Sequence, residues 1–165
     1  MDSQTAYAVA CKSGGGSALA QVFDDLVRTE TRLYNHLNDR LRQAHGIVTS
    51  QFELLRHLRA HPGTRVADIA ETFAIGIGAT SKSLDRLERS GWVRRTPNPA
   101  DRRSSLIELT TEGARLAGEA DVTFTRELAA LLGDASSPDD LVAAGAFLAR
   151  LRASLEAGRV GVPTG

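Results

Sequence analysis

Seven cationic side chains lie between residues 82 and 103, in a protein whose formal net charge is zero. The same stretch contains only three acids, which leaves a local excess of +4. Guanidinium and ammonium groups at this density bind phosphate oxygens, so the pattern favours a nucleic acid as the partner. The alternative is a solvated charged face, the usual role of a charge run. The cations are Lys82, Arg86, Arg89, Arg94, Arg95, Arg102 and Arg103.

No catalytic motif accompanies this cluster. The chain lacks a phosphate-binding loop of P-loop spacing, a Gly-x-Ser-x-Gly elbow and a metalloprotease helix motif. His57 and His61 are four residues apart, a spacing that can hold a metal, but no cysteine or acidic cluster completes a ligand set. The sequence therefore predicts a protein that is not an enzyme and that has no metal or cofactor.

The chain has a single cysteine, Cys11, which excludes an internal disulfide and fits a reducing cytosol. No apolar run is long enough to span a membrane, and the N-terminus lacks the pattern of a secretory signal. We therefore expect a cytoplasmic protein without membrane contact. Cys11 is either an inert thiol or, with Tyr7 nearby, a redox sensor.

Periodicity and turn residues predict the elements that position the cations. Residues 1–16, which include a Gly-rich run, read as a flexible tail, and 17–45 as one long amphipathic helix. Two short helices joined by a tight turn are expected over 65–89, the second at about 77–89. A β-hairpin follows over 92–109, turned by Pro97-Asn98-Pro99.

Two more helices follow the hairpin. One is expected over about 111–132, and Ser137-Pro138 is typical of the start of the last helix, with proline at its first position. Apolar residues recur in that helix at alternating steps of three and four, a seam that packs against another helix. They are Leu141, Ala144, Leu148, Leu151 and Leu155. We expect one domain over 17–157, in which 48–113 form a winged lobe and 17–45 and 114–157 form helical arms, followed by a flexible tail over 158–165.

The run LDRLERSGWVRRTPNPADRRSSLIELTTEG, from Leu84 to Gly113, resembles the MarR family of bacterial regulators. The matching hallmarks are a recognition helix that ends in DRL-x3-GWV, a Pro-Asn-Pro turn, and the pattern D-x-R-x5-LT-x2-G. The resemblance implies a mainly α fold with a small β-hairpin wing (α+β), a winged helix-turn-helix whose N- and C-terminal helices form a dimerisation arm. It also implies a homodimer on a pseudo-palindromic double-stranded DNA operator, usually a repressor, in the bacterial cytoplasm and nucleoid-associated when bound.

The same resemblance assigns roles in DNA binding. The first half of the recognition helix would read bases, which points to the polar residues Thr80, Ser81 and Lys82, with Arg86 on a phosphate. Arg103 would be the wing arginine in the minor groove, where a guanidinium suits the narrow, electronegative groove of A·T-rich DNA, and Arg102 would share that role or bind phosphate.

Asp85 and Asp101 are predicted to brace the wing against the recognition helix. The resemblance implies that Asp85 pairs with Arg103. Pairing with Arg89 at i,i+4 along the same helix is the competing account, and the sequence does not decide between them.

The resemblance further implies a small-molecule effector, aromatic or phenolic in many members, bound between the arm and the lobe. The residues expected to line that pocket are Tyr34, Leu37, Phe52 and Arg56, and those expected at the dimer interface are Phe124, Leu128, Leu141, Ala144, Leu148, Leu151 and Leu155. Two other functions stay open: a winged-helix module that binds protein rather than DNA, and a redox-responsive regulator that uses Cys11.

Overall fold

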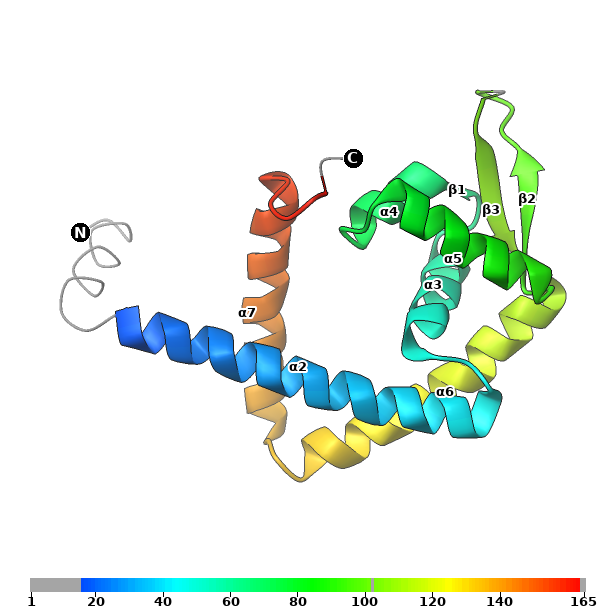
Figure 1. The fold of residues 1–165 in the computed structure, drawn as a ribbon. Helices are drawn as coiled ribbons and strands as arrows, with labels where there is room; N and C mark the ends of the chain where they lie inside the picture. Colours follow the sequence, from blue (N-terminus) through cyan, green and yellow to red (C-terminus); the bar gives the residue numbers. More distant parts are fainter. Residues whose placement is uncertain (1–15, 102, 164–165) are drawn as a thin grey trace.

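The computed structural model describes residues 16–101 and 103–163. Its elements confirm the predicted winged helix, with helices at both ends and a hairpin between them (Figure 1). The long first helix covers Gly16–His45 within the described residues, while Cys11 lies outside them. In chain order the elements are α2 (Gly16–His45), α3 (Thr49–Ala60), β1 (Thr64–Arg65), α4 (Val66–Thr72), α5 (Ile77–Arg89), β2 (Val93–Pro97), β3 (Ser105–Leu109), α6 (Thr111–Gly133) and α7 (Pro138–Ala157).

The core of the lobe lies where α3, α4 and α5 pack on the sheet and on the first half of α6. Phe52 of α3, Ile69 of α4 and Leu84 of α5 are fully buried there, together with Ile107 of β3. The small residues Ala117 and Ala120 let α6 lie close to this cluster. Burial of these apolar side chains fixes α5 on the lobe and leaves its opposite face in solvent.

The sheet has three antiparallel strands in the order β1-β3-β2, one more than the sequence predicts. In the hairpin, Val93 pairs with Leu109 and Pro97 with Ser105. Thr64 of β1 pairs with Ile107, and its Oγ1 donates to the carbonyl oxygen of His61 at 2.6 Å. A two-residue strand has no periodicity of its own, so only the packed hairpin reveals it.

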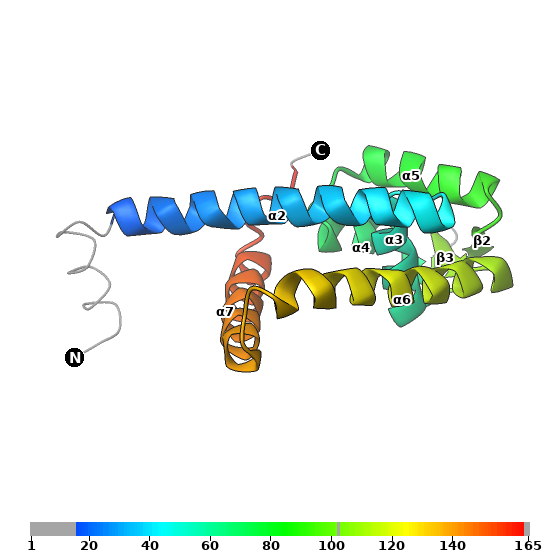
Figure 2. The same cartoon turned by 90° about the horizontal axis from the view of Figure 1, so that it is seen from below.

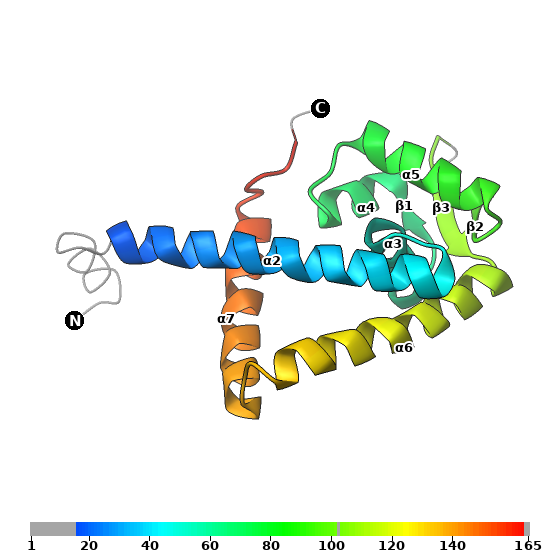
Figure 3. The ribbon, with the colours of Figure 1, turned by 60° about the horizontal axis from the view of Figure 1, so that its bottom comes forward.

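The helices outside the lobe form an open arm. Helices α2 and α6 pack together near the lobe and diverge away from it, and α7 runs from the far end of α6 past the middle part of α2 (Figures 2 and 3). Helix α7 has no buried residue, and α2 buries only Leu37 and Leu41, both in its second half. No helix in the described part of the chain has the length and apolarity of a membrane span.

Candidate nucleic-acid interface

Helix α5 has an inner and an outer face. Thr80, Leu84 and Leu87 point into the lobe, while Lys82 and Arg86 are exposed on the outer side. The helix starts after Gly76, and its last turn is basic, which suits the negative end of the helix dipole. The outer face therefore presents cations that do not contribute to the core.

The prediction that Thr80 reads bases is wrong. Its side chain is on the inner face, only 3% of the residue is exposed, and its hydroxyl donates to the carbonyl oxygen of Gly76 at 3.2 Å. A hydroxyl that donates to a backbone carbonyl of the preceding turn has its hydrogen-bonding need met inside the protein, where water is excluded. Ser81, by contrast, is half-buried and Lys82 is exposed, so both keep an accessible position on the helix.

Asp85 braces the wing, but its partner is neither of the two predicted. Its carboxylate contacts the guanidinium of Arg95 on β2 at 2.5 Å, and Glu88 contacts the same group at 3.2 Å. Among the described residues, the Arg89 side chain bonds only to the backbone carbonyl oxygen of Asp85, at 3.2 Å. The connection between recognition helix and wing therefore uses Arg95, whose side chain is 27% exposed, rather than Arg103.

The turn of the wing is held by its own polar side chains. Asn98 is buried; its Oδ1 accepts from the N–H of Ala100 at 3.0 Å, and its Nδ2 donates to Ser104 at 2.9 Å. Asp101 accepts from the backbone N–H of Arg103 at 3.0 Å, so it orders the turn rather than bracing the wing against α5. These bonds hold the backbone on either side of the turn and place Arg103 near its tip, and Arg102 lies outside the described residues.

Ion pairs neutralise some cations of the cluster and leave others without an acidic partner among the described residues. Arg94 pairs with Glu108 across the hairpin at 2.8 Å, and Arg95 is held by two acids. Lys82, Arg86 and Arg103 form no ion pair with any residue in the described ranges. The cations left to meet phosphates therefore lie on the outer face of α5 and at the wing tip. Sequence reasoning missed Arg95, Asn98 and Glu108, and only the pairing of Arg94 with Glu108 follows from the hairpin register.

Helix α6 begins in a close contact with the segment that follows α5. The Thr110 hydroxyl donates to the carbonyl oxygen of Gly91 at 2.7 Å and accepts from the N–H of Gly113 at 3.0 Å. The N–H of Thr110 donates to the carbonyl oxygen of Trp92 at 3.0 Å. A Cβ on Gly113 would lie 1.9 Å from that oxygen, so only glycine fits. The LT-x2-G motif thus joins α6 to the end of the recognition helix.

The four residues predicted to line an effector pocket lie on α2 and α3, and their role stays a prediction. Leu37 and Phe52 are buried in the interior. Arg56 lies over the ring of Phe124, 5.1 Å from its centroid, and the Tyr34 hydroxyl donates to Glu53 at 3.4 Å. Burial raises the pKa of both Tyr34 and Glu53. The Glu53 carboxylate raises the pKa of Tyr34 further, whereas the hydrogen bond with Tyr34 partly offsets the rise in the pKa of Glu53.

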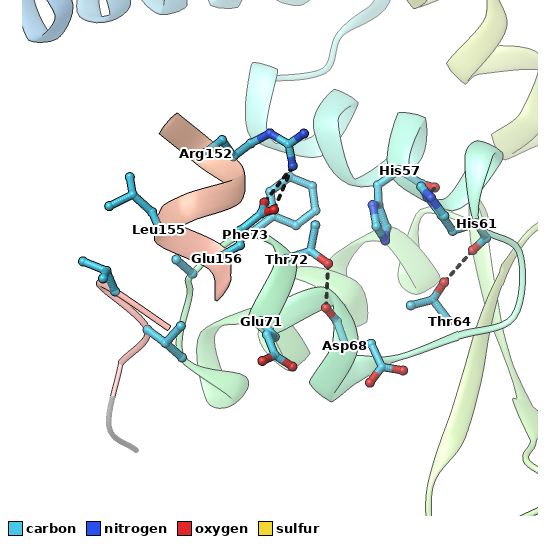
Figure 4. A pocket seen from close by; sticks show the side chains of 13 residues that line it. His57, His61, Thr64, Asp68, Glu71, Thr72, Phe73, Arg152, Leu155 and Glu156 are labelled. Carbon is cyan, nitrogen blue, oxygen red and sulfur yellow. Dashed lines mark hydrogen bonds and ion pairs between the residues drawn. The ribbon is translucent and has the colours of Figure 1, made fainter. Parts of the chain in front are cut away.

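A cavity of about 810 Å³ opens elsewhere, between the α3–α4 side of the lobe and the end of α7 (Figure 4). Phe73 and Leu155 supply apolar surface, and Arg152 bonds Glu156 beside them at 2.8 Å. Nε2 of His57 is buried with no hydrogen-bond partner in the described part of the chain. Among those residues, no group of three or more His, Cys, Asp or Glu side chains could hold a metal.

Most of the predicted interface residues lie on uncovered faces. Leu141, Leu148, Leu151 and Leu155 of α7 are between 37% and 43% exposed. Ala144 is exposed as well, and Leu128 is partly buried. Phe124 is partly buried instead, because its ring packs in a tilted arrangement against Phe52 of the core, with centroids 4.9 Å apart.

Residues 47–105, the winged lobe, match the model of the MarR family. The chain carries a MarR-family domain. It is 34% identical over 88 residues to the multiple antibiotic resistance protein MarR of Escherichia coli K12, a match that covers 51% of this chain and 61% of that protein. It is 33% identical over 84 residues to the HTH-type transcriptional repressor MdtR of Bacillus subtilis, covering 51% of this chain and 50% of the repressor.

The MarR-type fold extends beyond the matched lobe. A crystal structure of a mutant E. coli MarR in complex with operator DNA superposes with a TM-score of 0.70 at 26% identity, covering 84% of this chain and 96% of that one. The sequence matches, in contrast, span less than two thirds of the two curated relatives. The helical arms therefore resemble those of E. coli MarR in their fold, while the similarity in sequence is concentrated in the winged lobe.

Proposed function

We propose that this chain is a DNA-binding transcription regulator and not an enzyme. The observation that carries the proposal is the pair of unneutralised cationic surfaces on α5 and at the wing tip, joined by the contact of Arg95 with Asp85. A recognition helix fits the major groove, while the hairpin tip reaches the neighbouring minor groove. The relatives named above, among them a MarR solved on operator DNA, support this function.

Individual roles follow from position. Ser81 and Lys82 face the base edges, Arg86 binds a phosphate, and Arg103 enters the minor groove. Arg102 stays a predicted partner of Arg103 at the tip. Because phosphate contacts release counterions, affinity should fall steeply as salt rises.

The regulator acts as a homodimer on a pseudo-palindromic operator, as a repressor in the bacterial cytoplasm. The support for the dimer is the row of exposed large apolar side chains along α2 and α7, because contiguous exposed apolar surface marks a site of protein association. A two-fold dimer places two α5 helices in successive major grooves. The exposed apolar residues are Leu19, Val22, Phe23, Leu26 and Val27 of α2, and Leu141, Val142, Phe147, Leu148, Leu151 and Leu155 of α7.

A small aromatic effector releases the DNA by binding one arrangement of arm and lobe better than the other. The cavity between α4 and α7 supports this step, because it lies between the first helix of the helix-turn-helix and the arm. It combines the Phe73 ring with Nε2 of His57, which has no hydrogen-bond partner among the described residues. The ligand can shift the equilibrium only by its difference in affinity for the two arrangements.

The test is selection from a randomised duplex pool, followed by titration of the selected duplex at several salt concentrations. The double variant Lys82→Ala, Arg103→Ala should abolish specific binding, while Arg115→Ala, an exposed arginine on α6 paired with Glu112 and Glu119, should bind normally. Leu148→Arg should give a monomer by light scattering. Wild type that selects no duplex, yet forms a stable complex with another protein, would instead establish a protein-binding module.

A further inference from the structure

The first turn of α5 presents hydrocarbon where a reading helix usually presents polar groups. Ile77 is 61% exposed, Gly78 has no side chain, and Ala79 is exposed. Thr80, the only hydroxyl in this turn, is turned inward and bonded to the preceding turn. Ile75, just before the helix, is also 45% exposed.

The exposed Ile77 side chain contributes little to the stability of the fold. An isoleucine stabilises a protein when its side chain is buried away from water, and most of the Ile77 side chain is exposed to solvent. The turn is also outside the arm surfaces that a second copy would cover, because it lies in the lobe at the start of the recognition helix (Figure 1). Cationic Lys82 and Arg86 follow on the same helix, so the apolar turn forms the N-terminal end of the helix proposed to meet DNA.

One base edge in the major groove matches hydrocarbon. Each base pair shows donors and acceptors there, but only thymine adds an apolar group, its C5 methyl. The N-terminal residues of a recognition helix are those that meet base edges. A side chain without donors or acceptors in that position can discriminate between bases only through this methyl.

We propose that Ile77, supplemented by the methyl of Ala79, reads the C5 methyl of a thymine in each half-site. The proposal rests on the DNA-binding function proposed above and names a determinant of its specificity. Lys82 remains the hydrogen-bonding partner one turn further along the helix, so the two residues read by different chemistry. The site then depends on a methyl group rather than on the hydrogen-bonding edge of an A·T pair.

The experiment removes the methyl from the DNA rather than from the protein. A duplex selected by wild type from a randomised pool is resynthesised with each thymine replaced in turn by uracil, which keeps every hydrogen-bonding group. Wild type should lose affinity at one position per half-site, by about fourfold for each, the equivalent of burying one methyl at about 0.8 kcal/mol. Replacing that T·A pair by 5-methylcytosine·G should retain more affinity than unmodified C·G.

The variant Ile77→Ala should bind the thymine duplex more weakly and should no longer distinguish it from the uracil duplex. Lys82→Ala is the matched control: it should weaken both duplexes while keeping the fourfold ratio. Circular dichroism and thermal melting confirm that Ile77→Ala is folded, as expected for an exposed position.

Three outcomes distinguish a failure of the proposed methyl readout from a failure of the proposed DNA-binding function. Wild type that binds thymine and uracil duplexes equally at every position overturns the methyl readout but leaves DNA binding intact. Ile77→Ala that keeps the full ratio shows that another residue reads the methyl, and also overturns the proposal. Failure to select any duplex refutes the proposed function itself.

Discussion

Gly113→Ala should destabilise the protein severely, although it adds only one methyl group at the start of a helix. The added Cβ would lie 1.9 Å from the carbonyl oxygen of Trp92 and 2.8 Å from its carbonyl carbon. Both are backbone atoms, so no flexible side chain can move aside. The same oxygen accepts the N–H of Thr110 at 3.0 Å, and any shift of the chain strains that bond too.

The magnitude follows from two terms. Overpacking a well-packed interior costs about 1–3 kcal/mol even where neighbours can adjust, and a weakened N-cap at Thr110 adds about 1 kcal/mol. We expect a loss of roughly 3 kcal/mol or more in the free energy of unfolding. For a chain of this length, that lowers the melting temperature by roughly 6–12 °C. Urea denaturation followed by circular dichroism measures the loss directly.

Gly118→Ala is the matched control, because it makes the same substitution in the same helix. Its Cβ would meet only the tip of the Arg59 side chain, at the ordinary distance of 3.6 Å. Alanine is favoured over glycine in a helix by about 1 kcal/mol, so this variant should be more stable than wild type. If Gly113→Ala unfolds at the same denaturant concentration as wild type, the close approach of α6 to Trp92 is not as described.

Three further perturbations test other parts of the structure. Thr110→Ala should cost about 1 kcal/mol of stability, by removing a helix cap and its bond to the preceding turn, whereas Thr110→Ser should retain most of it, as denaturant midpoints will show. Ala74→Gly should raise the melting temperature, because Ala74 has a φ of 50° in the turn between α4 and α5, where an L side chain is strained; an unchanged or lower value would contradict this. Burial, and then the neighbouring His61, lower the pKa of His57 from its ordinary 6.5, so the unfolded chain binds more protons and stability should fall as pH drops below about 6.5. His57→Gln should flatten that pH dependence, and an unaltered slope would assign it to other groups.

The order of elements could be predicted from sequence because each carries its own periodicity or turn chemistry. The hairpin illustrates this: Pro97-Asn98-Pro99 cannot continue a strand, so the turn is fixed by local constraints. Strand β1 could not be predicted in the same way, because two residues show no period and their pairing with β3 depends on the packed lobe. Local rules identify elements, and long-range pairings require the fold.

In the candidate site, too, local features could be predicted from sequence and long-range contacts could not. That Lys82 and Arg86 are exposed follows from helical spacing, since Leu84 and Leu87 must face inward. Thr80 was misassigned because its polarity suggested an outward direction, yet a threonine bonded to the carbonyl four residues back can be buried at little cost. The partner of Asp85 was also missed, because Arg95 reaches it only through the placement of a strand that sequence spacing does not specify.

The contacts at the start of α6 have a consequence for regulation. Thr110 bonds the carbonyl oxygens of Gly91 and Trp92, immediately after the recognition helix, and Gly113 lies against the same backbone. Helix α6 is at once part of the arm and, through these contacts, fixed to the end of α5. A change in the angle between the arms of the proposed dimer must then carry α5 with it, because Gly113 lies directly against the backbone of Trp92 and leaves α6 no room to shift alone. We therefore expect Thr110→Ala to weaken the response of DNA binding to an effector more than it weakens DNA binding itself, and titrations with and without effector distinguish the two.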